Sequence, residues 1–434
     1  MITGNGGLMQ QSRVEAERKK KQRRKRRRNT LLVINLAMLV IIAGLTIGGA
    51  WTGLLDLGIF KPDGASSAAA QGQTAAPSPT VVKDEANVQT NAEADTETEA
   101  QPEIKSEQHQ PDASIDQDSN TESIKLTFVG DIINAGKVAA VVEKYGYDYP
   151  YTYVKDLFTQ DDLTIANLET PITSRGVPAL DKQFVYKSSP KMADAMKTAG
   201  IDVVNLANNH ILDQGEQGLL DTFSLLTKSK INYVGAGKDM EEAYRPVVIE
   251  KKGISVAVFG FSRVIPEVSW YAGKNKPGVA ATYDPVKAVE AINKVRDQVD
   301  LVIVIPHWGK EKEDHPVDYQ RSLAKAYIDA GADLIVGGHP HVLQGFESYK
   351  GKWIAYSMGN FIFTRAEQPK TWETMVLEAT CTKDGHITLQ MKPYYTELGR
   401  AVPMDTADAE ALIKRVESIS YHTSIDKQGR VTAP

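Results

Sequence analysis

Residues 334–341 read LIVGGHPH, an apolar run that ends in two glycines and two histidines. The same pattern recurs through much of the chain, where short apolar runs followed by polar side chains alternate with amphipathic segments. The apolar runs are Ile124–Val129, Leu163–Asn167, Val203–Leu206, Val256–Phe261, Leu301–Ile305, Leu334–Val336 and Trp353–Tyr356. Buried strands that alternate with helices predict an α/β domain.

The segments between and after these runs predict helices and one hairpin. Four segments carry apolar residues at helical spacing. They are Leu219–Leu226, Val286–Gln298, Tyr319–Ala330 and Thr406–Ser418. Met375–Thr382 and His386–Lys392 flank a glycine-containing turn, which is typical of a β-hairpin.

The N-terminal part of the chain predicts a membrane anchor. Residues 31–51 (LLVINLAMLVIIAGLTIGGAW) carry no charge, and nine of the ten residues from Lys19 to Arg28 are Lys or Arg. About 20 apolar residues match a hydrocarbon core of ~30 Å, and the basic run favours a cytoplasmic N-terminus. We therefore predict a basic cytoplasmic segment over 1–28, a transmembrane helix over 29–52 and an extracellular remainder, at the cell membrane of a Gram-positive type envelope.

Two other interpretations of this region are weaker. A cleaved signal peptide usually has an apolar region of roughly 7–15 residues, and the run here is longer. A basic run can also bind nucleic acid. Its position directly before a spanning segment favours a role in topology, so no nucleic-acid partner is expected.

Residues 53–122 predict a disordered acidic spacer. The segment is rich in Ala, Gln, Ser, Thr, Pro, Asp and Glu and has no aromatic residue after Phe60, so it cannot bury enough apolar surface to fold. The folded domain is expected over 123–400, with a C-terminal helix and tail over 401–434. Because Cys381 is the only cysteine, the domain forms no internal disulfide and depends on its core.

Polar residues gather where the predicted strands end, which is where open α/β sheets bind ligands. They are Asp131, Asn167, Glu169, Asn208, Asn209, His210, Asp213, His307, Glu311, His339, His341 and Asn360. A single histidine at a strand end is more often structural, but several such sets at successive strand ends favour a shared site. Imidazole, carboxylate and amide oxygen suit Mn, Fe or Zn and exclude a thiolate-type zinc site.

These motifs resemble the CapA family of poly-γ-glutamate capsule biosynthesis proteins. The resemblance covers Ile124 to about Gly399. It depends on FVGD at Asp131, ANLETPIT at Glu169, DVVNLANNHILDQG at His210, PHWGKE at His307, GGHPHVLQG at His339 and YSMGNFIF at Asn360. It implies a calcineurin-like metallophosphoesterase sandwich, in which helices flank two β-sheets, here preceded by one transmembrane helix.

The resemblance also implies residue roles. Six residues match metal ligands, with Glu169 as the bridging carboxylate: Asp131, Glu169, Asn209, His307, His339 and His341. His210 matches the catalytic histidine, and Asp213 follows it by one helical turn. Asn167, Asn208, Glu311 and Asn360 are expected to support the ligands or contact substrate. Ile133 stands where the phosphoesterase pattern has a histidine, so one or two divalent ions both remain compatible with the sequence.

Three functions fit these observations. The favoured one is a membrane-anchored component of poly-γ-glutamate or capsule polymer biosynthesis or export, with membrane subunits and an anionic polymer as partners. The second is a metal-dependent hydrolase of a phosphoester or of an envelope amide or ester, so enzymatic activity is left open. The third is a non-catalytic scaffold, whose Gly44-xxx-Gly48 pattern would pack against partner helices. Basic residues near the motifs would bind the polymer or form solvated surface: Lys182, Lys187, Arg263, Lys310, Lys312 and Arg365.

Overall fold

A seven-stranded sheet carries the GGHPH turn. The computed structural model describes residues 81–82, 122–180 and 182–434. The strand order is β1 (Val81–Val82), β7 (Val247–Lys251), β8 (Ile254–Ser262), β10 (Leu301–His307), β11 (Leu334–Val336), β13 (Lys352–Met358) and β12 (Leu343–Tyr349). Strands β8, β10, β11 and β13 run parallel to one another, so their carboxyl ends lie at one edge of the sheet.

A ten-stranded sheet contains the chain's first long strand and its hairpin. Its main path is β18 (Ser424–Ile425), β19 (Arg430–Thr432), β16 (Ile387–Glu397), β15 (Glu373–Thr382), β2 (Ser123–Ile132), β3 (Leu163–Leu168), β4 (Ile201–Asn205) and β5 (Asn232–Val234). Two further strands attach to it, β14 (Asn360–Ile362) beside β2 and β17 (Arg400–Pro403) beside β16. Strands β2 to β5 are parallel, and β15 and β16 form the predicted hairpin.

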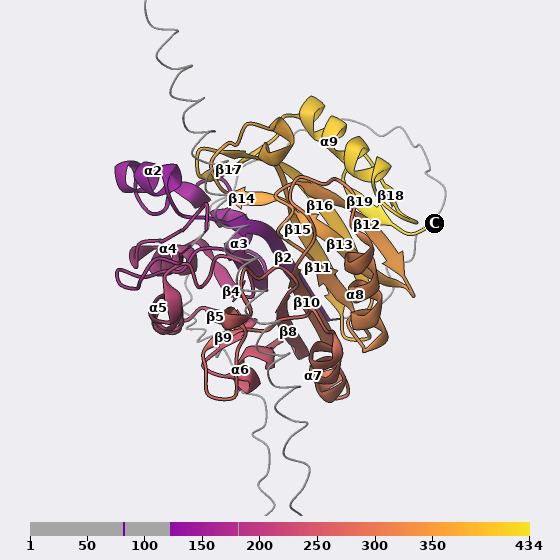
Figure 1. The fold of residues 1–434 in the computed structure, drawn as a ribbon. Coiled ribbons are helices and arrows are strands. Elements are labelled where there is room, and N and C mark those ends of the chain that lie inside the picture. Colours follow the sequence, from indigo (N-terminus) through magenta and orange to yellow (C-terminus); the bar gives the residue numbers. More distant parts are fainter. Residues whose placement is uncertain (1–80, 83–121, 181) are drawn as a thin grey trace, which may run out of the picture. The chain divides into compact units, whose positions relative to one another are not determined.

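Helices cover the outer face of each sheet (Figure 1). Outside the ten-stranded sheet lie α2 (Lys137–Tyr145), α3 (Lys155–Thr159), α4 (Lys191–Ala199) and α5 (Gly215–Lys228). Outside the seven-stranded sheet lie α6 (Met240–Tyr244), α7 (Val286–Arg296) and α8 (Asp318–Asp329). The predicted α/β class, with helices flanking two sheets, is confirmed.

The core between the sheets explains the apolar runs. In β10, Leu301, Ile303 and Ile305 face the inter-sheet core, whereas Val302 and Val304 pack beneath the helices. A strand covered on both faces must be apolar at successive positions, and so it shows no alternation. Helix α9 (Thr406–Ser418) adds Leu412, Ile413 and Val416 to the same inter-sheet core.

Short elements complete the domain. They are the strands β6 (Ala236–Gly237) and β9 (Gly278–Val279) and the 3₁₀ turns η1 (Tyr149–Tyr151), η2 (Val268–Trp270) and η3 (Pro369–Trp372). The region after residue 400 continues the ten-stranded sheet, because β19 pairs with β16. Helix α7 ends at Arg296, two residues before the predicted Gln298, and Gly331 follows α8 with a φ of 112°.

The predicted N-terminal segment (1–28) and transmembrane helix (29–52) lie outside the described residues, as does the predicted spacer except for its residues 81, 82 and 122. Within the described part of the chain, every helix is too short or too polar to cross a membrane.

Candidate metal centre

The site lies where the parallel strands of both sheets end. Asp131 in β2 is in register with Asn167 in β3, and Asn167 is in register with Asn205 in β4. In the other sheet, His307 ends β10 and pairs with Gly338 after β11. Parallel strands place their carboxyl ends together, so motifs that are far apart in the sequence meet at one edge.

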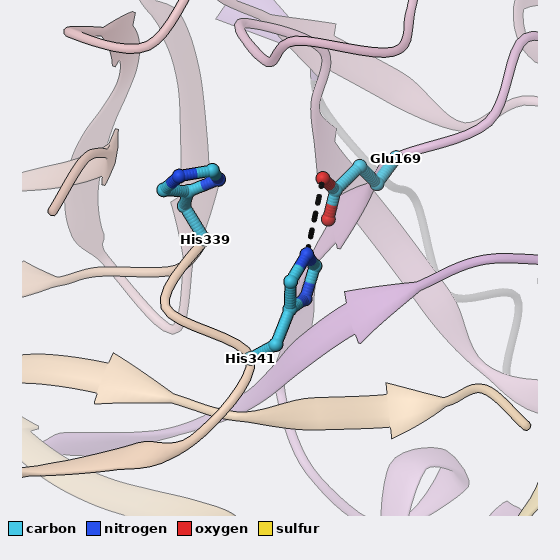
Figure 2. Close-up of side chains that lie close together, drawn as sticks. All are labelled: Glu169, His339 and His341. Atoms are coloured by element: carbon cyan, nitrogen blue, oxygen red, sulfur yellow. Dashed lines mark ion pairs between the residues drawn. The ribbon is translucent and has the colours of Figure 1, made fainter. Parts of the chain in front are cut away.

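Two groups of metal-ligand type share one carboxylate. Glu169, His339 and His341 each offer a ligand atom, and these atoms lie within 4.8 Å of one another; the same holds for Asp131, Glu169 and His307. Figure 2 shows His341 pointing at Glu169, with His339 beside them. The Glu169 Oε1 atom lies 3.5 Å from His307 Nε2 and 4.0 Å from His341 Nε2. Glu169 therefore stands where a bridging carboxylate would stand.

Several buried polar atoms at this site lack hydrogen-bond partners among the described residues. Both carboxylate oxygens of Glu169 and the Nδ1 atom of His339 accept or donate no hydrogen bond among the described residues, and Glu169 is 0% exposed. A buried polar group without a partner costs roughly 1–3 kcal/mol, and a charged group costs more. A divalent cation would satisfy these atoms, so the donor set fits a metal ion of the Mn, Fe or Zn type.

The ionisation of the cluster also favours a cation. Burial and the nearby Asp131 carboxylate raise the pKa of Glu169 well above its ordinary value. Burial lowers the pKa of His307 and His339 well below the ordinary value, so both imidazoles are neutral and able to bind metal. Burial opposes a charge on His341, but the carboxylates of Glu169 and Asp131 prevail and raise its pKa to about 9. His341 thus supplies the positive charge that a metal ion would otherwise supply.

The GGHPH turn brings its histidines close to Asp131 through unusual backbone conformations. His339 and His341 both have a positive φ, 97° and 57°, which is rare for residues with a side chain. A Cβ atom at Gly338 would lie 2.7 Å from Asp131 Oδ1, so only glycine allows this approach. The His339 backbone N–H donates to Asp131 Oδ2 at 3.3 Å. Strained backbone of this kind is concentrated at functional sites.

Asparagines hold the ligands in place. Asn167 donates from Nδ2 to Asp131 Oδ1 at 2.7 Å and accepts at Oδ1 from Asn205 at 3.0 Å and from Asn208 at 3.4 Å. Asn208 also donates to the Leu168 carbonyl at 2.8 Å. Asn167 and Asn208 therefore lie where they would support the predicted ligands. Asn205, three residues before the Asn208-Asn209-His210 motif, was not among the predicted site residues.

Two further amide contacts orient the histidine ligands. Asn360 Oδ1 accepts from His341 Nδ1 at 2.9 Å, which leaves His341 Nε2 facing Glu169. Such a second layer fixes the tautomer and ring angle of a metal-binding histidine. Asn209 Oδ1 lies 2.8 Å from His307 Nε2, so amide oxygen, imidazole and the Glu169 carboxylate converge on one point.

His210 is held by residues behind its ring. Its Nδ1 donates to Asp213 Oδ2 at 2.7 Å, and the ring of Tyr186 lies against the imidazole, with 4.3 Å between centroids and a 33° tilt between the rings. Asp213 is 0% exposed and forms an ion pair with Lys182, whose Nζ also donates to the Asn209 carbonyl at 2.5 Å. Lys182 thus holds Asp213 and the Asn209 backbone in place. Tyr186 was not anticipated, and no motif in the sequence marks it.

Glu311 and Ile133 occupy different surroundings. Glu311 is exposed, and its charge contributes to the raised pKa values of Glu169 and His341, which places it at the rim of the site. Ile133 is buried at 2% exposure and provides no ligand atom. The ligand that the phosphoesterase pattern expects there is therefore missing from this site.

Comparisons with known proteins agree with the sequence resemblance. Residues 125–365 match the family model described as bacterial capsule synthesis protein PGA_cap. The PGA biosynthesis protein CapA of Bacillus subtilis (strain 168) is 32% identical over 313 residues, which cover 71% of this chain and 82% of that protein. The capsule biosynthesis protein CapA of Bacillus anthracis is 34% identical over 293 residues, covering 66% and 71%. A 5'-nucleotidase from Candida albicans SC5314 has a TM-score of 0.36 at 11% identity, over 62% of this chain and 51% of that chain, a likeness too low for further argument.

Proposed function

The chain belongs to the PGA_cap family of bacterial capsule synthesis proteins, and from this premise we propose a specific role. The protein is a membrane-anchored, extracytoplasmic component of poly-γ-glutamate or related capsule polymer biosynthesis or export. Its α/β domain, of the metallophosphoesterase type, holds a divalent metal ion at the strand ends. The charge-free run at 31–51 and the basic run before it support the anchor and the outward topology. Membrane subunits and an anionic polymer are the partners that this role requires.

One observation supports the metal most directly, namely that two ligand groups share a buried carboxylate whose oxygens accept no hydrogen bond among the described residues. The ion would be held by Asp131, Glu169, Asn209, His307, His339 and His341. When bound, it would supply Lewis-acid polarisation of a substrate oxygen. Asn167 and Asn360 orient the ligands, and the burial of the cluster excludes water from their inner sides.

The test measures metal content and polymer formation together. The full-length wild-type protein and a His339→Ala/His341→Ala double variant are purified in detergent with Mn, Fe and Zn supplied, and the metals are counted by elemental mass spectrometry. The same variants are expressed in a strain that lacks the gene, and surface polymer is quantified. His386→Ala/His422→Ala is the matched control, because both of these histidines are exposed and lie outside the site.

We expect near-stoichiometric metal and restored polymer in the wild type and the control, and loss of both in the double variant. Metal that persists in the double variant would refute the proposed ligand set. If the double variant restores polymer although it binds no metal, the role in the pathway would stand and the protein would act as a non-catalytic scaffold. A strain whose polymer does not change on deletion would contradict the biosynthetic role.

A second candidate function, metal-dependent hydrolysis, is favoured by the His210–Asp213 pair. Asp213 accepts a hydrogen bond from His210 Nδ1 and would stabilise the imidazolium form, whose Nε2–H could donate a proton to a leaving oxygen. The substrate would be a phosphoester or an envelope amide or ester. Turnover that disappears in His210→Ala while metal content stays unchanged would support this function, and equal turnover in both proteins would exclude His210 as the general acid.

A further inference from the structure

The basic residues near the site fall into two kinds. Three of the six have a carboxylate partner: Lys182 with Asp213, Lys310 with Glu313, and Arg365 with Glu397. The other three have no such partner among the described residues: Lys187, Arg263 and Lys312. Lys187 and Lys312 are exposed, as expected of solvated surface, whereas Arg263 is half-buried. A half-buried guanidinium without a counter-charge differs from ordinary surface charge.

Two tyrosine rings hold the Arg263 side chain. Its guanidinium carbon lies 3.9 Å from the ring centroid of Tyr283 and 4.9 Å from that of Tyr319. Tyr319 is itself fixed, because its hydroxyl accepts from the Gly309 N–H at 2.9 Å and donates to the Gly309 carbonyl at 2.8 Å. Ring faces attract the cation without occupying its N–H groups. The guanidinium is therefore positioned while its donors make no hydrogen bond within the described part of the chain.

Arg263 lies at the same sheet edge as the metal centre. Its backbone N–H donates to the His307 carbonyl at 2.9 Å, and the preceding Ser262 is in register with His307. His307 belongs to one of the two ligand groups, whereas Arg263, the first residue after β8, lies against Tyr319 at the start of α8. An extended polymer crossing this edge would meet the metal centre and Arg263 in turn.

Resting on the proposed function, we infer that Arg263 is a specificity-determining residue that binds a free carboxylate of the γ-glutamyl polymer. The carboxylate belongs to a residue neighbouring the one at the metal centre. A guanidinium presents paired N–H donors that match a carboxylate bidentately, which an ammonium group cannot do. A chain with one carboxylate per residue suits an anion subsite placed beside the metal centre.

The test is isothermal titration calorimetry on the full-length, metal-loaded protein in detergent at about 0.15 M salt, where diffuse charge effects are screened. The probes are a γ-linked glutamate pentamer, the same pentamer with its carboxylates amidated, and inorganic phosphate. The variants are Arg263→Ala, Arg263→Lys and the matched control Lys294→Gln, which removes one exposed charge from the last turn of α7. Metal content is measured for every variant.

We expect Arg263→Ala to bind the pentamer about tenfold more weakly, as the loss of a charged hydrogen bond predicts. Metal content and binding of the amidated pentamer should not change, Arg263→Lys should recover only part of the affinity, and Lys294→Gln should match the wild type. Equal pentamer binding by wild type and Arg263→Ala overturns the inference and leaves the proposed function standing. Full recovery by lysine overturns bidentate recognition. Arg263-dependent binding of phosphate without pentamer binding overturns both the inference and the polymer class in the proposed function.

Discussion

Charged side chains at the two ends of strand β3 differ in whether they have hydrogen-bond or ion-pair partners. At its carboxyl end, Glu169 is fully buried and neither oxygen accepts a hydrogen bond within the described residues. At its amino end, a cavity of about 520 Å³ is lined by the first residues of β3 and β5 and by the start of β4. There Lys197 pairs with Asp202 at 2.7 Å, and Glu242 accepts from the Tyr233 hydroxyl at 3.0 Å. Lys197, Asp202 and Glu242 at this cavity thus have interaction partners.

This difference distinguishes a surface cavity from a candidate ligand-binding site. Charged side chains around the cavity are partly exposed, at 40% for Lys197 and 23% for Asp202, so water and each other satisfy them. Glu169 is fully buried and its oxygens accept no hydrogen bond within the described residues, so a bound cation would relieve the cost of burying it. At the candidate metal centre, the indicator of function is a buried carboxylate whose oxygens accept no hydrogen bond within the described residues, and the presence of a cavity carries less information.

Among the tests of this comparison, Glu169→Gln should give the largest effect, which is on metal content. The substitution removes the carboxylate that both ligand groups share, so retained metal should fall by at least about tenfold. Glu242→Gln, at the cavity end, should keep the wild-type metal content. Elemental mass spectrometry of both purified full-length proteins provides the measurement. Metal retained in Glu169→Gln would show that the two ligand groups do not depend on a shared carboxylate.

Removal of the metal should lower the free energy of unfolding by about 4 kcal/mol when the free ion exceeds its dissociation constant by about a thousandfold. Denaturant unfolding with and without a chelator measures this difference. The chelator should have little effect on Glu169→Gln, because that variant has already lost the ion. An equal shift in both proteins would mean that the stabilising ion binds elsewhere.

The ion pairs near the two ends of strand β3 should differ in their contribution to stability. Lys182→Met removes the ammonium partner of the fully buried Asp213, so the free energy of unfolding should fall by about 3 kcal/mol. Lys197→Met breaks a partly exposed pair and should cost less than about 1 kcal/mol. Urea unfolding of both variants compares them directly. Similar losses would show that burial does not separate these two pairs.

Asp161 precedes β3 at the amino end and should give a small effect that depends on pH. Burial raises its pKa from 3.8 to about 6, and one carboxylate oxygen has no hydrogen-bond partner within the described region. Between about pH 4 and pH 6 the folded state binds more protons than the unfolded state, so this group's contribution to stability falls as pH rises. Asp161→Asn should therefore be more stable than the wild type by about 1 kcal/mol at pH 7.5, a value reduced for partial exposure, and equally stable near pH 4. Urea unfolding at both pH values tests this, and an advantage that persists at pH 4 would contradict it.

Much of the α/β domain was predictable because its strands are buried on both faces. The runs beginning at Ile124, Leu163, Leu301 and Leu334 all appear as strands, and helix Thr406–Ser418 has the predicted bounds. Helices α2, α4 and α6 and the short strands β6, β9 and β14 were not predicted. These elements are two to nine residues long, and such short segments show too little periodicity to be recognised without their tertiary partners.

The candidate site was predictable as a set of residue types at strand ends, but its internal roles were not. Asp131, Glu169, His307, His339 and His341 do converge. Lys182, in contrast, was a candidate for polymer binding and instead neutralises Asp213. Such a role depends on a loop that returns to the site, and the sequence distance of 31 residues between the two groups conceals the contact.

By itself, the sequence determined the class of the domain, the family and the residue types at the site, because apolar runs and motifs are local properties of the chain. Only the tertiary structure decided that Glu169 is shared by two ligand groups, that Asp213 is paired with Lys182, and that Arg263 has no carboxylate partner within the described part of the chain. These properties depend on which side chains meet across strands and loops, and on how far burial removes water from each charge. Pairing and desolvation are relations between distant residues, and they exist only after the chain has folded.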